Sequence, residues 1–259
     1  MRYDFHAHIY PEKIAARAVE GVGNFYQLPM AADGTAETLL KLGNPAGITN
    51  YIVHSVATGA KQVESVNDFI ACEMRKYPKE LIGFGTLHPD YPDLLGELER
   101  IERLGLRGLK LHPDSQRFYV DDERMYPVYD YLQGRLPLLL HCGDYRFDYD
   151  HPRRVRKLLE DFPKLTVIAA HFGGWSVFDL AVEYLLDMNC YLDCSSSIMF
   201  LGRRRALELI RLYGAERMLF GSDYPMWNPA EELSVLQSLG LSETELDCML
   251  YKNAEAILE

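Results

Sequence analysis

Two histidines separated by one residue, His6 and His8, follow a short apolar run at the start of the chain. On a β-strand, residues i and i+2 point to the same face, so both imidazoles can reach one ion. An H-x-H pair alone is a weak signal, since it also occurs as two packed or exposed histidines. The positions of the remaining histidines therefore indicate whether this pair binds a metal ion.

Seven of the eight histidines stand where an apolar, strand-like run ends, and one lysine and one aspartate also end such runs. These residues are His6, His8, His54, His88, Lys110, His112, His141, His171 and Asp223. Imidazole nitrogens and carboxylate oxygens are the mixture of ligands that a borderline-soft ion such as Zn²⁺ accepts. With His141, His171 and Asp223 added to the H-x-H pair, the sequence predicts a metal site.

The runs that end in these residues alternate with amphipathic segments along the whole chain. The predicted strands cover residues 2–5, 51–56, 81–87, 107–111, 136–140, 166–170, 190–194 and 217–220. Eight repeats in 259 residues give about 32 residues each, the size of one unit of a (β/α)₈ barrel. We predict a single (β/α)₈ TIM barrel domain over residues 1–259, with its site at the carboxyl ends of the strands. A Rossmann-like sheet is the rival fold, but the first strand is not followed by G-x-G-x-x-G, and the chain has no P-loop.

Helical periodicity fills most of the segments between these strands. The predicted helices cover residues 62–77, 92–104, 123–133, 152–161, 177–186, 203–213, 229–239 and 242–258. The longest interruptions are residues 9–35 and 142–151. We expect both to be loops over the barrel mouth.

Five stretches of the chain resemble, in order, the motifs of one family. They are D-x-H-x-H-x-x-P at residues 4–11, G-L-K-L-H-P at 108–113, His141, H-F-G-G at 171–174 and G-S-D-Y-P at 221–225. This set is similar to the amidohydrolase superfamily, and within it to the amidohydrolase-related branch that includes metal-dependent aminocarboxymuconate-semialdehyde-type decarboxylases. The ordered motifs are specific for the superfamily and the branch, but they do not specify a substrate.

The resemblance implies one divalent ion, usually Zn²⁺, held by His6, His8, His141 and Asp223, with a water molecule completing the shell. It also implies that His171 stands beside this water as the acid/base catalyst, a task that Asp223 can share. The physics agrees, because a bound cation lowers the pKa of its water toward neutrality. Histidine titrates near neutral pH and can take or return the proton.

Lys110 leaves the number of metal ions open. In binuclear members of the superfamily, a carbamylated lysine at the fourth strand bridges two ions, and the resemblance then implies that His141 and His171 bind the second one. Alternatively, Lys110 is a free ammonium group that holds a substrate carboxylate, or a strand-end lysine that reaches solvent. We favour one ion, because the motifs resemble the mononuclear branch.

The predicted substrate-binding residues are Lys110, His112, Arg146 and Trp175. An arginine on a loop can bind a carboxylate through two parallel hydrogen bonds, and Trp175 can form a pocket wall. His54 and His88 are weaker candidates, since either can be a satisfied histidine at the barrel rim.

The composition excludes several classes of partner. Acidic residues outnumber basic ones by 38 to 27, which gives a net charge of −11 and argues against nucleic acid and anionic membranes as partners. We expect a small, anionic substrate and a cytoplasmic location, since the sequence shows no signal peptide and no apolar run long enough to span a bilayer. A homodimer is expected only by analogy with other barrel enzymes.

Three functions remain open at this point. By default we predict a hydrolase in which a metal-activated water attacks a small amide, lactone or ester. The alternative is a non-oxidative, metal-dependent decarboxylase of a small unsaturated or aromatic carboxylate. The third is a non-catalytic, ligand-binding barrel, which is disfavoured because every metal and acid/base position is filled.

Overall fold

Eight parallel strands form a closed barrel in the computed structural model, which describes residues 1–259. The strands are β1 (Tyr3–His8), β2 (Asn50–His54), β3 (Leu81–Gly83), β4 (Leu109–Leu111), β5 (Leu138–Leu140), β6 (Val167–Ala169), β7 (Tyr191–Asp193) and β8 (Met218–Leu219). Two ladders, β1 to β3 and β4 to β8, are joined into a ring by the bridges Ala7–Tyr224 and Gly85–Leu109. The predicted (β/α)₈ architecture is confirmed.

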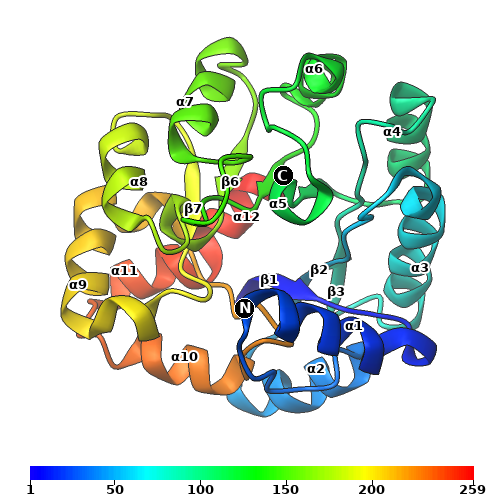
Figure 1. Ribbon diagram of the computed structural model, residues 1–259. Helices are drawn as coiled ribbons and strands as arrows, with labels where there is room; N and C mark the ends of the chain where they lie inside the picture. Colours follow the sequence, from blue (N-terminus) through cyan, green and yellow to red (C-terminus); the bar gives the residue numbers. More distant parts are fainter.

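Helices surround the strands in chain order (Figure 1). They are α1 (Glu12–Tyr26), α2 (Ala36–Gly43), α3 (Val63–Lys76), α4 (Leu94–Arg103), α5 (Pro113–Gln116), α6 (Tyr126–Leu132), α7 (Pro152–Asp161), α8 (Phe178–Leu185), α9 (Ile198–Tyr213), α10 (Pro229–Gln237), α11 (Glu243–Asp247) and α12 (Asn253–Leu258). The predicted helix 152–161 matches α7 residue for residue. No helix combines the length and the apolar composition needed to cross a bilayer.

Alternation along the strands builds two separate cores. On β2, Tyr51 and Val53 face outward into the main core between strands and helices, whereas Ile52 faces the barrel interior. The interior core also contains Phe5, Phe84, Leu139, Ile168 and Leu219, and Ala254 of α12 packs against it. The amino-terminal end of the barrel is therefore filled with apolar side chains, which leaves the carboxyl end for polar residues.

The expectation that residues 9–35 form a loop is wrong, because α1 occupies fifteen of them. Its start carries no side-chain cap, since Pro11 precedes it, and Gly21 and Gly23 interrupt its pattern with poor helix formers. The helix α2 was also not predicted. By contrast, residues 142–151 contain only turns and irregular backbone, as expected.

Candidate functional site

A one-residue irregularity in β1 turns both histidines of the H-x-H pair toward the barrel interior. Asp4 pairs with Tyr51 and Ala7 with Val53, so β1 advances by three residues where β2 advances by two. This is the count of a β-bulge, a feature that recurs beside active sites. It allows Phe5 to fill the apolar layer while His6 and His8 lie above it, with 3.3 Å between their Nε2 atoms.

Asp223, after β8, completes a triangle with these two histidines. Its Oδ1 lies 3.4 Å from Nε2 of His6 and 3.4 Å from Nε2 of His8. Ligand atoms held at about 2.0–2.1 Å from one ion in tetrahedral geometry stand about 3.3–3.4 Å apart. The three side chains therefore have the spacing of one face of a metal tetrahedron.

The second oxygen of Asp223 is held away from this triangle. Ser196 donates its hydroxyl to Asp223 Oδ2 at 2.5 Å, and the indole N–H of Trp227 donates to Ser196 at 2.7 Å. The backbone of Asp223 has a positive φ of 56°, a conformation that costs energy in a residue with a side chain and recurs at functional sites. The fold thus fixes which oxygen of Asp223 faces the histidines.

The seventh strand supplies a positioning group that the sequence did not reveal. Asp193 Oδ2 accepts a hydrogen bond from Nδ1 of His6 at 2.8 Å, which leaves the His6 Nε2 lone pair for a ligand. Its Oδ1 accepts from the backbone N–H of His171 at 3.1 Å and of Ser195 at 3.0 Å, and from the Ser195 hydroxyl. Its signal in the sequence is an aspartate near the end of the run 190–194, two residues before the first of three serines.

Burial keeps the histidines of the triangle neutral, as metal binding requires. Desolvation, followed by the charge of Lys110, lowers the pKa of both His6 and His8 well below the usual 6.5. Lys110 is completely buried, and its Nζ lies 3.1 Å from His6 Nε2. Burial lowers the pKa of Lys110 to about 8. The expectation that it reaches solvent is therefore wrong.

His141 and His171 face each other across the same end of the barrel. His141 Nδ1 lies 3.1 Å from His171 Nε2. The other nitrogen of each ring donates to a backbone carbonyl, His141 Nε2 to Gly143 at 3.0 Å and His171 Nδ1 to Ser195 at 3.0 Å. In the neutral rings, the two facing nitrogens then both carry lone pairs. A proton or a metal ion between them removes this repulsion.

Two buried carboxyl groups lie beside His141. Asp114 Oδ2 is 3.7 Å from His141 Nε2, and both oxygens of Asp114 and one of Asp150 lack a hydrogen-bond donor. Burial, and then the carboxylate of Asp144, raises the pKa of Asp114 to about 8. Burial, and then Asp114, raises the pKa of Asp150 well above its usual value. Side chains 36 residues apart meet here because β4 and β5 are neighbours.

A cavity of about 610 Å³ opens above these groups. His8, His112, His141, His171 and Asp223 contribute to its lining. One face of α1 forms a wall, together with apolar side chains such as Val56 and Phe69. Two exposed arginines, Arg17 and Arg117, also line it. Three of the four predicted ligand residues, the predicted base and the predicted substrate residue His112 thus line one cavity, and the fourth ligand, His6, lies beside His8.

Two predicted substrate residues are engaged elsewhere. Arg146 binds Asp144 through several hydrogen bonds of 2.6–3.1 Å and donates to the backbone oxygen of Phe25 at 2.7 Å. Trp175 packs edge-on against Tyr26, with 5.2 Å between the ring centroids. Neither residue lines the cavity. Both instead hold the last turn of α1, a helix that the sequence did not predict.

The comparisons with known proteins agree with the motifs. The family model described as Amidohydrolase matches residues 3–259. Gamma-resorcylate decarboxylase from Polaromonas sp. (strain JS666) is 23% identical over 288 residues, covering 89% of this chain and 85% of that protein.

Two solved structures show the same fold. An uncharacterized TIM-barrel protein, Bb4693, from Bordetella bronchiseptica has a TM-score of 0.77 and 22% identity, covering 99% of this chain and 98% of that one. A dihydroxybenzoic acid decarboxylase from Polaromonas sp. JS666, with bound manganese and the inhibitor 2-nitroresorcinol, has a TM-score of 0.77 and 18% identity, covering 99% and 96%.

The family match spans nearly the whole chain, and the ordered motifs of the sequence fall within it. The chain belongs to the amidohydrolase family.

Proposed function

We propose that the chain is a metal-dependent decarboxylase that releases CO₂ from a small aromatic or unsaturated carboxylate. The observation that carries this proposal is the triangle of His6, His8 and Asp223, with 3.3–3.4 Å between its ligand atoms. Two members of the triangle, His8 and Asp223, line the cavity. The gamma-resorcylate decarboxylase relative favours this reaction over the hydrolysis that the sequence led us to expect.

The donor set fits one divalent ion. His6, His8 and Asp223 would hold it, and His141, whose Nδ1 carries a lone pair, would be the fourth ligand. Zinc accepts this mixture of nitrogen and oxygen, and the manganese of the Polaromonas structure makes Mn²⁺ a second candidate. When bound, such an ion supplies positive charge that holds the carboxylate of the substrate and stabilises the negative charge that develops during the reaction.

The reaction needs one proton and no water. The bond between the ring carbon and the carboxylate breaks, CO₂ leaves, and the electron pair stays on the ring carbon, which then takes a proton. His171 lines the cavity, and its Nδ1–H is held by the backbone oxygen and the hydroxyl of Ser195 at 3.0 and 2.9 Å. The His171 Nε2 is therefore the atom that carries and delivers the proton, a task that Asp223 shares.

The cavity favours a small anion with a flat apolar body. Arg17 and Arg117 lie at its edge without an ion-pair partner, so they attract a carboxylate. The side chain of His112, hydrogen-bonded to Tyr26 at 2.7 Å, offers a polar contact further in. Lys110 does not line the cavity. Its Nζ lies 3.1 Å from His6 Nε2, so its charge acts on the metal centre rather than directly on the substrate.

A substrate screen tests this proposal. Metal-loaded protein is incubated with gamma-resorcylate, other hydroxybenzoates, lactones and esters, and both CO₂ release and hydrolysis products are measured. We expect CO₂ from at least one carboxylate, with one solvent proton incorporated in the product. Hydrolysis of a lactone or ester without CO₂ release would restore the hydrolase alternative and reject the decarboxylase.

A further inference from the structure

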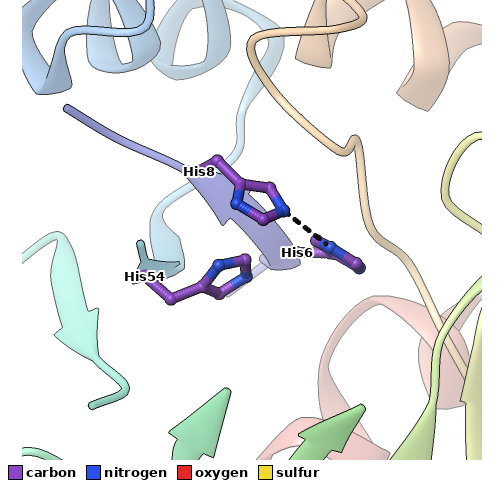
Figure 2. A group of neighbouring side chains, drawn as sticks. All are labelled: His6, His8 and His54. Carbon is purple, nitrogen blue, oxygen red and sulfur yellow. Dashed lines mark hydrogen bonds between the residues drawn. The ribbon is translucent and has the colours of Figure 1, made fainter. Parts of the chain in front are cut away.

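A third imidazole stands beside the two histidines of the triangle. His54 ends β2, and its Cα is the register partner of His8 on the neighbouring parallel strand. Residues in register on adjacent strands point to the same face, so the His54 side chain enters the barrel next to His8. Figure 2 shows the three rings, with His54 directed toward the space beside the His6–His8 contact.

The His54 ring lies against the rings of the other two histidines. Its centroid lies 4.3 Å from that of His8 with the planes at 87°, and 5.1 Å from that of His6 at 65°. One nitrogen of each of the three rings lies within 4.8 Å of the others. These three nitrogens therefore form one cluster of potential metal ligands in the barrel interior.

Packing alone does not account for an imidazole at this position. His54 is completely buried, and neither of its ring nitrogens has a hydrogen-bond partner. A buried polar group without a hydrogen-bond partner destabilises the folded chain, whereas an apolar side chain of similar size carries no such penalty. His88, which ends the next strand, is different, because its Nδ1 accepts the backbone N–H of Asp90 at 3.2 Å.

We propose that His54 is a ligand of the metal centre, contributed by β2 in addition to the triangle of His6, His8 and Asp223 and to His141. This inference rests on the proposed function, because it requires that the triangle holds a metal ion. A ligand from β2 places an additional neutral nitrogen in the shell and accounts for a buried imidazole without a protein partner. It also favours ions that accept several nitrogens, such as Zn²⁺ and Co²⁺, over Mg²⁺ and Ca²⁺.

The test compares metal affinity with the stability of the metal-free chain. Affinity for Zn²⁺ and Co²⁺ is measured by competition with a chromogenic chelator, and thermal unfolding is followed without metal. The variants are His54→Phe, the control His88→Phe on the neighbouring strand, and His8→Phe in the triangle itself. We expect His54→Phe to weaken metal binding at least tenfold and to leave the melting temperature of the metal-free chain unchanged or higher.

Each outcome separates the two proposals. Affinity within twofold of the parent for His54→Phe, together with a large loss for His8→Phe, overturns the role of His54 and leaves the metal centre intact. Unchanged affinity in both variants overturns the metal centre itself. A merely structural His54 would lower the melting temperature and spare the affinity. If His54→Phe does not fold, His54→Gln replaces it, with the same expected loss and the same contradicting result.

Discussion

The substitution Asp193→Asn probes how the fold prepares His6 for metal binding. The carboxylate oxygen Oδ1 faces three donors, the backbone N–H groups of His171 and Ser195 and the Ser195 hydroxyl. The oxygen of the asparagine amide is therefore kept at this position, because the opposite orientation sets an NH₂ group against all three donors. The NH₂ group then occupies the place of Oδ2 and faces Nδ1 of His6.

This orientation reverses the tautomer of His6. The Nδ1 atom, which donates to Asp193 at 2.8 Å, becomes an acceptor, and the proton moves to Nε2, where it blocks the metal. For His6 to bind metal through Nε2, its proton must return to Nδ1, where it faces the NH₂ group of the asparagine amide. Two donors then face each other, at a cost of about 1–3 kcal/mol. Loss of such a supporting carboxylate typically weakens metal binding about 10–100-fold, which corresponds to about 1.4–2.7 kcal/mol.

Chelator competition with purified, metal-free protein measures this effect. The control is Asp187→Asn, an exposed carboxylate that pairs with Arg156, and circular dichroism verifies that both variants are folded. We expect a 10–100-fold rise in the dissociation constant for Asp193→Asn and no change for the control. Equal affinity in the two variants would refute the assignment of Asp193 as the group that orients His6.

Four further outcomes follow from the site. Replacing His8 or Asp223 with Ala removes bound metal and activity together, as elemental analysis and a CO₂ assay on the same preparations will show. His171→Asn keeps the metal but lowers turnover about 10²–10⁴-fold, and normal turnover would exclude His171 as the proton donor. Dialysis against a strong chelator abolishes activity and added Zn²⁺ or Mn²⁺ restores it, so that full activity in demetallated protein contradicts the mechanism. In the metal-free chain between pH 4 and about 8, Asp114 is protonated in the folded state and ionised in the unfolded state. The free energy of unfolding therefore falls by up to about 1.4 kcal/mol per pH unit as the pH rises through this range. Urea unfolding of Asp114→Asn should show a weaker dependence of this free energy on pH, and the same dependence as in the parent would contradict the prediction.

The sequence was sufficient for the barrel and for the positions of the strand-end histidines. An apolar run that ends in a polar residue is a local pattern, and parallel strands bring all such ends to one rim. His8, His112, His141, His171 and Asp223 consequently share one cavity although they come from five strands. The i, i+2 spacing of the H-x-H pair was also informative, because strand alternation directly determines where both rings point.

The parts that could not be predicted depend on contacts between distant segments. Arg146 donates hydrogen bonds to Asp144 and to the backbone oxygen of Phe25. The second bond exists only because α1, which contains Phe25, packs against the loop that carries Arg146. Asp193 could not be predicted because its hydrogen bonds reach His6 on β1 and the backbone of His171 after β6, which only the closed barrel brings beside β7. In each case the side chain has an ordinary local sequence, and its role is set by the strand or helix beside it.

A crystal structure of the protein grown with Zn²⁺ or Mn²⁺, with an anomalous difference map at the metal edge, tests the central claim most directly. We predict one peak at the barrel mouth, about 2.0–2.3 Å from Nε2 of His6, Nε2 of His8 and Oδ1 of Asp223. Two peaks, with the second between His141 and His171 beside a carbamylated Lys110, would contradict the one-ion centre. A map without a peak at the triangle would contradict the metal-dependent mechanism altogether.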